Sequence, residues 1–265
     1  MAAAAEPLLP ISAVIITKNE ADRIGRCLAS LRFAAEVIVV DSGSTDGTVE
    51  LATSLGARVV HHDWLGYGPQ KNYAISLATQ PWTLSIDADE EVTPALAQAL
   101  RQRLGEEVPP RVAGFRMRRQ LVFAGRRLRF GRSVNYPVRL FRTHCGTFDA
   151  VTIHESLRVD GDVASLRGTL LHHSYRSLSD YLTTLNSFTS LTAQDKAARG
   201  CRVPRGYALR LPWEIFHRYF LRLGVLDGRP GLQWCLLSAF YVYVKYAKLD
   251  ELLSRPRQAD APQRR

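Results

Sequence analysis

The sequence has 265 residues, of which 46% are hydrophobic, and its 35 Lys and Arg against 25 Asp and Glu give a formal net charge of +10. The hydrophobic share is ample for a packed core, and the length fits one main domain with an appended region. Four widely spaced cysteines without a Cys-x-x-Cys pair argue against a zinc site or a disulfide framework and predict reduced thiols.

The basic excess favours anionic partners, which include a phospholipid surface, a phosphorylated glycolipid and nucleic acid. Residues 1–10 are expected to form a flexible N-terminus. The first six residues lack both a basic region and a long apolar core, so we expect no signal peptide and predict that the protein stays in the cytoplasm.

Strand and helix patterns alternate from the start of the chain. The β-branched run at 11–17 predicts a strand, and the apolar spacing of Ile24, Cys27 and Leu28 predicts a helix after it. Further strands are predicted at 37–40, 58–61 and 82–86. Further helices are predicted from Thr48 and around 70–77. Four such alternations imply a parallel α/β sheet.

Ligands of parallel sheets bind beyond the carboxyl ends of the strands. The polar side chains expected at that edge are Asn19, Asp41, Lys71, Asp87 and Asp89. They should therefore gather in one crevice.

The fourth predicted strand ends in Asp87-Ala88-Asp89. In an extended chain alternate side chains project to the same face, so the two carboxylates can converge on one hard cation. Such a pair can hold Mg²⁺ or Mn²⁺ with open positions for phosphate oxygens. An isolated pair of this kind is more often a solvated turn or a helix start, so the upstream residues decide its meaning.

Arginines are frequent in the middle of the chain. The run over 116–132 is compatible with a solvated hairpin, an acceptor-phosphate site or a membrane-facing patch, and all three stay open. Arg139 and Arg142 lie three residues apart in a strand pattern, so only one of them can readily point into the site, where it would hold a diphosphate.

After about residue 175 the pattern becomes helical. The segment 178–199 is amphipathic, and 211–223 brings aromatic residues and arginines together, which suits a membrane interface. The apolar run at 232–244 is shorter than the roughly 20 residues that cross a bilayer, so it is expected to lie on or dip into the membrane. The alternative is a pair of ordinary core helices packed on the sheet domain.

Two further boundaries are predicted in this region. Residues 227–231 contain two glycines and a proline and are expected to form a helix-breaking loop. Residues 256–265 are expected to be a flexible tail.

Taken together, these motifs resemble those of family 2 inverting glycosyltransferases with the GT-A fold. The matching stretches are 14–20, 39–48, 70–74 and 86–90. Beyond them, 138–142, 153–155 and 226–231 are similar to the branch that contains lipopolysaccharide-core β-1,4-glucosyltransferases. The resemblance covers roughly residues 11–250.

The fold that this resemblance implies is a Rossmann-like, mostly parallel sheet flanked by helices. It divides the chain into a nucleotide-sugar-binding and catalytic domain over 11–175 and a helical, membrane-associating region over 176–255.

The resemblance also implies a nucleotide-sugar site. Asp41 is similar to the aspartate whose carboxylate accepts a hydrogen bond from the uracil or ribose, a role that suits a group that can only accept. Asp89 is similar to the direct ligand of Mg²⁺ or Mn²⁺, whereas Asp87 more often contacts the ribose or reaches the metal through water. The full set expected to bind the donor is Thr17, Asn19, Glu20, Asp41, Lys71, Asp87 and Arg139.

Inverting transfer needs a base that takes the proton of the acceptor hydroxyl. Many family members place it in an acidic pair that this chain lacks at the expected distance after Asp89, and the resemblance points to His154-Glu155 instead. Glu155 is the predicted base, with His154 as a positioning group or second metal ligand. Competing groups are Asp149 and the His172-His173 pair.

The sequence therefore predicts a metal-dependent inverting glycosyltransferase. It is expected to move a sugar from a UDP-sugar, UDP-glucose above others, to a lipopolysaccharide inner-core or related glycolipid acceptor at the inner face of the cytoplasmic membrane, with no nucleic acid as partner. One alternative is polyprenyl-phosphate sugar synthesis. A different class, a basic non-catalytic module for nucleic acid or an anionic surface, explains the charge but not the aspartate pair. A dinucleotide-dependent oxidoreductase is disfavoured, because no G-x-G-x-x-G follows the first strand.

Overall fold

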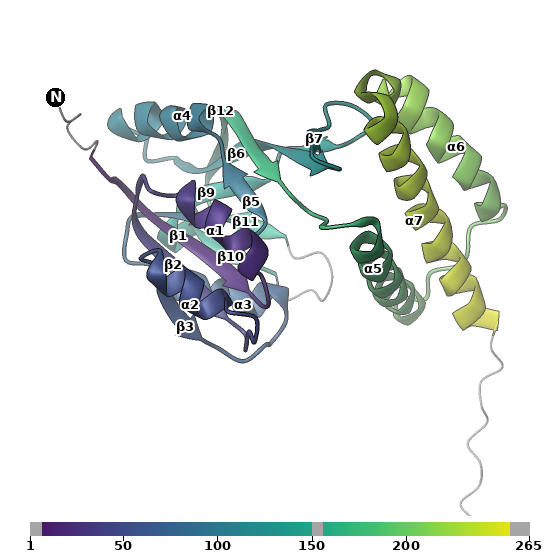
Figure 1. The fold of residues 1–265 in the computed structure, drawn as a ribbon, viewed down its shortest axis with the longest axis horizontal. Coiled ribbons are helices and arrows are strands. Elements are labelled where there is room, and N and C mark those ends of the chain that lie inside the picture. The colour runs from purple at the N-terminus through teal and green to yellow at the C-terminus, as the bar shows by residue number, and fades with distance from the viewer. Residues whose placement is uncertain (1–6, 150–155, 255–265) are drawn as a thin grey trace, which may run out of the picture. The chain divides into compact units, whose positions relative to one another are not determined.

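The computed structural model describes residues 7–149 and 156–254. The chain divides into two compact units. The sheet unit comprises residues up to 127 together with 133–174, and the helical unit comprises 128–132 together with the residues from 175 onward. Figure 1 shows the elements of both units.

The first part of the sheet unit alternates strands and helices. Its elements are β1 (Leu9–Thr17), α1 (Ala21–Ala29), β2 (Ala34–Asp41), α2 (Thr48–Ser54), β3 (Arg58–His61), α3 (Tyr67–Ser76) and β4 (Trp82–Ser85). The four strands are parallel and adjacent in the order β3-β2-β1-β4. The predicted mixed α/β fold with a parallel-dominated sheet is confirmed.

Strands in mixed orientation extend this sheet on the β4 side: β6 and β12 pair in parallel, and the other neighbours are antiparallel. The remaining elements are β5 (Glu90–Val92), α4 (Pro94–Gly105), β6 (Val112–Phe123), β7 (Arg126–Arg127), β8 (Val134–Asn135), β9 (Val138–Arg142), the 3₁₀ turn η1 (Thr143–Cys145), β10 (Gly146–Phe148), β11 (Leu157–Val159) and β12 (Asp162–His172). The order continues β4-β9-β6-β12-β5, with β9 antiparallel to both of its neighbours. Strands β10 and β11 form a separate antiparallel pair.

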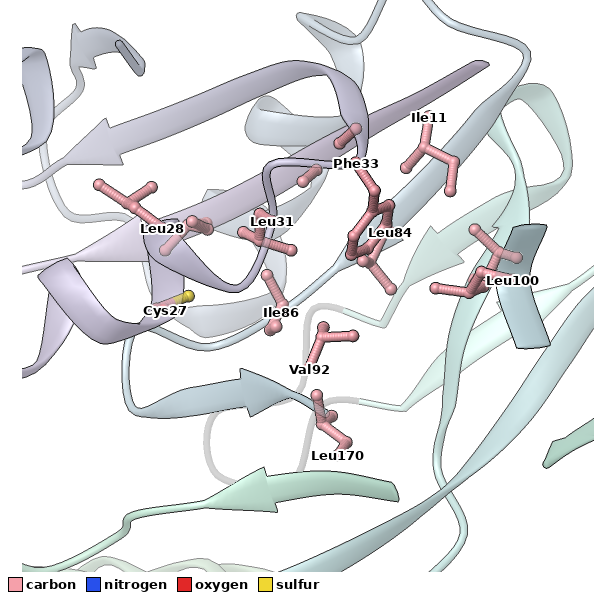
Figure 2. Packing of buried hydrophobic residues seen from close by; sticks show 14 of the residues in the cluster. Ile11, Cys27, Leu28, Leu31, Phe33, Leu84, Ile86, Val92, Leu100 and Leu170 are labelled. Carbon is pink, nitrogen blue, oxygen red and sulfur yellow. The ribbon is translucent and has the colours of Figure 1, made fainter. Parts of the chain in front are cut away.

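The core of the sheet unit lies on both faces of β1. Ile11, Ala13 and Ile15 pack into a cluster with residues of α1 and α4, whereas Val14 packs on the other face with Ala74 and Ile75 of α3. This alternation is the period of two that a strand imposes on its side chains. Figure 2 shows labelled members of the larger cluster, among them Leu28, Leu31, Leu84, Ile86 and Val92.

Polar side chains fix where the helices begin. The Thr93 hydroxyl accepts a hydrogen bond from the backbone N–H of Leu96, and Pro94 occupies the first turn of α4, where no N–H is needed. Asp46 accepts from the backbone N–H of Thr48 at the start of α2. These contacts hold the connections that follow the strands in one conformation.

The helical unit contains two long helices and a series of short turns. Its elements are α5 (Leu178–Ala198), η2 (Tyr207–Leu209), α6 (Arg210–Phe216), the π-helical η3 (His217–Leu221), η4 (Gly224–Asp227) and α7 (Gly228–Ser254). Helix α7 contacts both α5 and α6. Within the described residues, no helix combines the length and the apolar character needed to cross a membrane.

The prediction of a loop over 227–231 is wrong for most of those residues. Only Asp227 precedes α7, which begins at Gly228 and includes Pro230 and Gly231 in its first turn. A proline is tolerated there because the first N–H groups of a helix have no partner within the helix. The Asp227 carboxylate accepts hydrogen bonds from the backbone N–H groups of Arg129 and Phe130.

Candidate functional site

The carboxyl ends of β1, β2 and β4 lie beside one another, because these strands are adjacent and parallel. Thr17 at the end of β1 is the register partner of Asp41 at the end of β2. Asp87 and Asp89 follow directly after β4. The sheet topology therefore brings the predicted polar residues of three separate segments to one edge.

Asn19 and Glu20 join the loop after β1 to the loop after β2. The backbone N–H of Asn19 donates to the Ser44 hydroxyl, and the Asn19 side-chain oxygen accepts from the N–H of Thr45, both at 2.8 Å. The N–H of Glu20 donates to the Thr48 hydroxyl, also at 2.8 Å. Asn19 has a φ of 56°, in the left-handed region that asparagine tolerates better than most residues.

The Asp41 carboxylate organises the loop that follows it. It accepts hydrogen bonds from the backbone N–H groups of Gly43 and Ser44, each at 2.9 Å, and from the Ser44 hydroxyl. The residue is 3% exposed. A carboxylate offers about four lone-pair sites, so these three bonds leave room for one more donor.

Asp87 is surrounded by cations. Its carboxylate lies 2.6 Å from Arg139 Nη2, 3.1 Å from Lys71 Nζ and 3.8 Å from Arg119 Nη1. The buried Glu90 shares two of these partners, at 2.6 Å from Arg139 and 3.0 Å from Arg119. Burial raises the pKa of Asp87, but Arg139, Lys71 and Arg119 outweigh it and hold that pKa well below its usual value.

Within the described residues, Lys71, Arg119 and Arg139 contact Asp87, and the two arginines also contact Glu90. Burial alone would lower the pKa of Arg139, but Asp87 and Glu90 raise it. Lysine and arginine side chains gathered in this way can bind a phosphate group.

Only one of the two candidate arginines of β9 enters this network. Arg142 instead donates to the carbonyl groups of Val108 and Val112 and lies over the ring of Trp82. Residues three apart on a strand face opposite sides, as expected.

Two buried polar atoms at this edge lack a hydrogen-bond partner. In the part of the sheet unit that the structure describes, the Thr17 hydroxyl oxygen and Arg139 Nε are the buried side-chain atoms in this condition. Burying such groups without partners is costly, so each is a position where a ligand or a water can donate or accept a hydrogen bond. Both residues belong to the set expected to bind the donor.

Asp89 faces a different set of partners. One of its carboxylate oxygens lies 3.3 Å from His172 Nε2 and 3.7 Å from Arg23 Nη1. Burial raises the pKa of Asp89, but the charge and hydrogen bond of His172, together with Arg23, bring it below its usual value. The neighbouring His173 instead contacts Glu91, with Nε2 2.9 Å from the carboxylate.

A carboxylate beside an imidazole fits a divalent cation of the Mn²⁺ type, which accepts both oxygen and nitrogen ligands. Within the described residues no group of three or more His, Cys, Asp or Glu side chains is arranged to hold a metal ion. Asp89 and His172 would therefore supply two ligands, and other ligands would have to come from the substrate, water or residues outside the described part.

The predicted base and second metal ligand, Glu155 and His154, lie outside the described residues. The competing carboxylate Asp149 is paired with Arg158, whose Nε lies 2.8 Å away. The backbone N–H of Asp149 donates to the Ser156 carbonyl at 3.1 Å.

Four residues of the site were not among those predicted to form it. Glu90 lies in the matching stretch 86–90 but was given no role there, although its position just after the aspartate pair was a signal. Arg119 is one of seven arginines between 116 and 132, and nothing in the sequence distinguishes it. Arg23 pairs locally with Glu20, three residues before it, but its contact with Asp89 spans a chain separation that no local pattern encodes. His172 had been considered only as a competitor of His154.

The run of arginines over 116–132 does not act as one feature. Its part at 122–127 is an antiparallel hairpin of β6 and β7 with Arg126 and Arg127 exposed. Arg119 belongs to the Asp87 network, and Arg118 donates to Gln120 and Thr169.

Comparisons with known proteins agree with this geometry. The family model described as "Glycosyl transferase family 2" matches residues 12–159. The chain is 33% identical over 279 residues to the lipopolysaccharide core biosynthesis glycosyltransferase LpsC of Rhizobium meliloti, covering 96% of this chain and 98% of that one. It is 30% identical to an uncharacterized glycosyltransferase of Rickettsia typhi, covering 95% and 90% of the two chains.

Among solved structures, a mannosyltransferase from Pyrobaculum calidifontis in complex with GDP-Man and Mn²⁺ has a similar fold. The TM-score is 0.53 at 16% identity, over 91% of this chain and 87% of that one. At this identity the likeness concerns the fold alone.

Proposed function

The chain belongs to glycosyl transferase family 2, and from that premise we propose that it transfers a sugar from a UDP-sugar, UDP-glucose above others, to a lipopolysaccharide inner-core or related glycolipid acceptor with inversion at the anomeric carbon. The observation that carries the donor half is the pair of buried, unsatisfied atoms on Thr17 and Arg139. They lie in the set of residues that the donor is expected to contact.

The donor's nucleotide is proposed to bind at the ends of β1 and β2. Asp41 has acceptor capacity left for an imide N–H or a ribose hydroxyl, and Asn19, Glu20 and Thr17 shape the surrounding backbone. The diphosphate is proposed to face Lys71 and Arg139, two cations that contact Asp87 beyond the end of β4. In this proposal Asp87 positions the two cations and contacts the ribose.

Mg²⁺ or Mn²⁺ is proposed to be held by Asp89, with His172 beside it as the described nitrogen donor and His154 as the further ligand expected from the sequence. When bound, the cation would neutralise charge on the departing nucleoside diphosphate. The chain's own residues have two tasks there. Asp89 and His172 orient the ligands, and Arg23 restrains the Asp89 carboxylate from the side of α1.

Glu155 is proposed to take the proton from the acceptor hydroxyl as that oxygen attacks the anomeric carbon. A single displacement of this kind gives a β-linked product from an α-linked donor. Asp149 is the less favoured base, because its carboxylate is engaged by Arg158.

The acceptor proposal draws support from the similarity to LpsC, which is named for lipopolysaccharide core biosynthesis. Action at the inner face of the cytoplasmic membrane is proposed from the helical unit. Residues 199–229 contain seven arginines against two carboxylates. Seven apolar side chains in this segment are each between 46% and 73% exposed: Leu209, Trp213, Phe216, Phe220, Leu221, Leu223 and Leu226. Exposed aromatics flanked by arginines suit the surface of an anionic bilayer.

A transfer assay tests the catalytic proposal. Radiolabelled UDP-glucose and purified inner-core lipopolysaccharide are incubated with wild type, Glu155→Gln and the matched Asp149→Asn, and the anomeric configuration of the product is determined by NMR. We expect a β-linked product from wild type, a loss of about a hundredfold or more in kcat for Glu155→Gln, and a loss of less than about threefold for Asp149→Asn.

Two results would redirect the proposal. Near-normal turnover of Glu155→Gln would remove that residue as the base. Label that appears only on polyprenyl phosphate, when lipid extracts are offered together with lipopolysaccharide, would assign the enzyme to polyprenyl-phosphate sugar synthesis.

A further inference from the structure

Three basic side chains of the helical unit converge on one tyrosine ring. The centroid of Tyr246 in α7 lies 5.8 Å from Lys196 Nζ, 5.1 Å from Arg210 Cζ and 4.9 Å from Lys245 Nζ. Lys196 comes from α5, Arg210 from the start of α6 and Lys245 from α7. Tertiary structure therefore assembles this cluster, which we call the Tyr246 cluster.

The neighbouring carboxylates are engaged elsewhere. Asp195 lies next to Lys196 in the chain but pairs with Arg199 at 2.9 Å. Glu214, one turn after Arg210, pairs with Arg218 at 2.9 Å. Among the residues that the structure describes, no carboxylate forms an ion pair with any of the three cations of the Tyr246 cluster.

The three cations also destabilise one another. Burial lowers the pKa of Lys245, and the charges of Lys196 and Arg210 lower it further, while Glu214 only partly opposes them. Tyr246 does not remove this repulsion. An aromatic ring has two negative faces and a positive edge, so a third cation must either share a face or lie at the unfavourable edge.

An anion would offset this repulsion. We propose that Lys196, Arg210 and Lys245 form a phosphate site on the helical unit. The planar guanidinium of Arg210 can bind two phosphate oxygens at once, and the two ammonium groups supply point charges beside it. The chemistry is that of a phosphate mono- or diester, carried by a lipid headgroup or by a soluble phosphorylated compound.

The surroundings of the cluster favour the lipid. Leu209, which precedes Arg210, is 73% exposed, and Trp213, one turn further along α6, is 56% exposed. A phosphate with apolar chains beside it matches this combination better than a free anion does. The site belongs to the helical unit and is separate from the proposed donor site of the sheet unit, so its test needs no transferase activity.

The experiment compares two charge-matched double variants of the full chain in vesicle sedimentation at 0.15 M salt. One removes two cations of the cluster (Arg210→Gln with Lys245→Gln), and the control removes two exposed arginines elsewhere in the same unit (Arg222→Gln with Arg229→Gln). Vesicles contain phosphatidylglycerol with phosphatidylcholine, or phosphatidylcholine alone. Thermal unfolding followed by circular dichroism confirms that both variants are folded, and Lys196→Gln alone serves as a milder third variant.

Removing one basic residue that only adds to the general surface charge is expected to weaken binding to anionic vesicles about fivefold. The two double variants lose the same number of charges, so this effect alone would weaken both equally. A specific site predicts that the cluster variant binds the anionic vesicles at least about tenfold more weakly than the control variant. Competition by millimolar glycerol 3-phosphate, absent in the cluster variant, would support the same phosphate site with a soluble ligand as its source. Equal losses in the two double variants, or no binding of wild type to either the anionic vesicles or glycerol 3-phosphate, would overturn the proposal.

Discussion

His172 and His173 are neighbours in the chain but contact different carboxylates. His172 lies beside Asp89, whereas His173 lies beside Glu91. His173 is therefore a matched control for His172, the proposed metal ligand. We predict that His172→Ala weakens Mn²⁺-dependent binding of UDP-glucose by about tenfold or more, because the proposed nitrogen ligand of the cation is lost. His173→Ala should change it by less than about threefold.

Calorimetric titrations of UDP-glucose at fixed Mn²⁺ measure both affinities. Equal weakening by the two alanine variants would show that the effect is structural and would remove His172 from the proposed metal site.

Residue types at the sheet edge could be predicted, but their partners could not. Asp41, Lys71, Asp87 and Arg139 were expected there from strand ends and family motifs, and the structure places Lys71 and Arg139 on Asp87. Glu90 was not predicted as a site residue, because an acidic residue after an aspartate pair usually faces water. In the structure it is 1% exposed and forms ion pairs with two arginines, one from β6 and one from β9. Only the pairing of strands distant in the chain brings those arginines to it.

At the scale of elements, Glu36 of β2 ties together three segments. Its carboxylate accepts hydrogen bonds from the Ser12 hydroxyl of β1 and from both the backbone N–H and the hydroxyl of Thr79, after α3. Burial raises the pKa of Glu36, but these bonds and Arg58 outweigh it and leave the pKa below its usual value. A lowered pKa in the folded state means that the carboxylate stabilises the fold above about pH 4 and that this contribution is lost as the pH falls through the folded-state pKa.

We therefore predict that Glu36→Gln lowers the free energy of unfolding by about 1–3 kcal/mol at pH 7 and that its difference from wild type shrinks as the pH falls from about 4 towards 2. Urea denaturation at a series of pH values measures this difference, with the exposed Glu107→Gln as the control for loss of charge alone. A difference that stays constant over the acid range would show that the charge of Glu36 contributes nothing.

Strand β12 passes close to the start of α4 at Gly168. The residue has a φ of +100°, and a Cβ atom there would lie 2.5 Å from Leu96 Cα. We predict that Gly168→Ala destabilises the protein by about 2–4 kcal/mol, from overpacking and from the left-handed backbone together. Gly105→Ala, at the end of α4 with nothing within 4 Å of the added atom, should change stability by less than about 1 kcal/mol.

Both free energies come from the same denaturation experiment. A Gly168→Ala protein as stable as Gly105→Ala would mean that β12 does not pack on α4 as described.

The elements differed in how well the sequence encodes them. Strands β1, β2 and β4 are buried on both faces or nearly so, and such strands read as continuous apolar runs. Strand β5 is three residues long and contains two glutamates, so no periodic signal marks it. The start of α7 was missed because glycine and proline usually end helices, although their cost is small in a first turn.

At the scale of the whole molecule, basic residues that contribute to the net charge of +10 gather in separate places in the two units. In the sheet unit, Lys71, Arg119 and Arg139 are gathered around two carboxylates where a diphosphate is proposed to bind. In the helical unit, arginines accompany exposed apolar residues and the Tyr246 cluster. The basic composition that left nucleic acid, phospholipid and glycolipid open as partners is thus divided between two local features, each with its own test.

Metal-dependent binding of UDP-glucose to the full chain tests the central claim most directly. Calorimetry with Mn²⁺, then with a chelator, is compared for wild type and Asp89→Asn. We predict binding by wild type that the chelator weakens at least about tenfold, and binding by Asp89→Asn that is weak in both conditions. Folded wild-type protein that binds neither UDP-glucose nor any other sugar nucleotide, with or without Mn²⁺, would contradict the account.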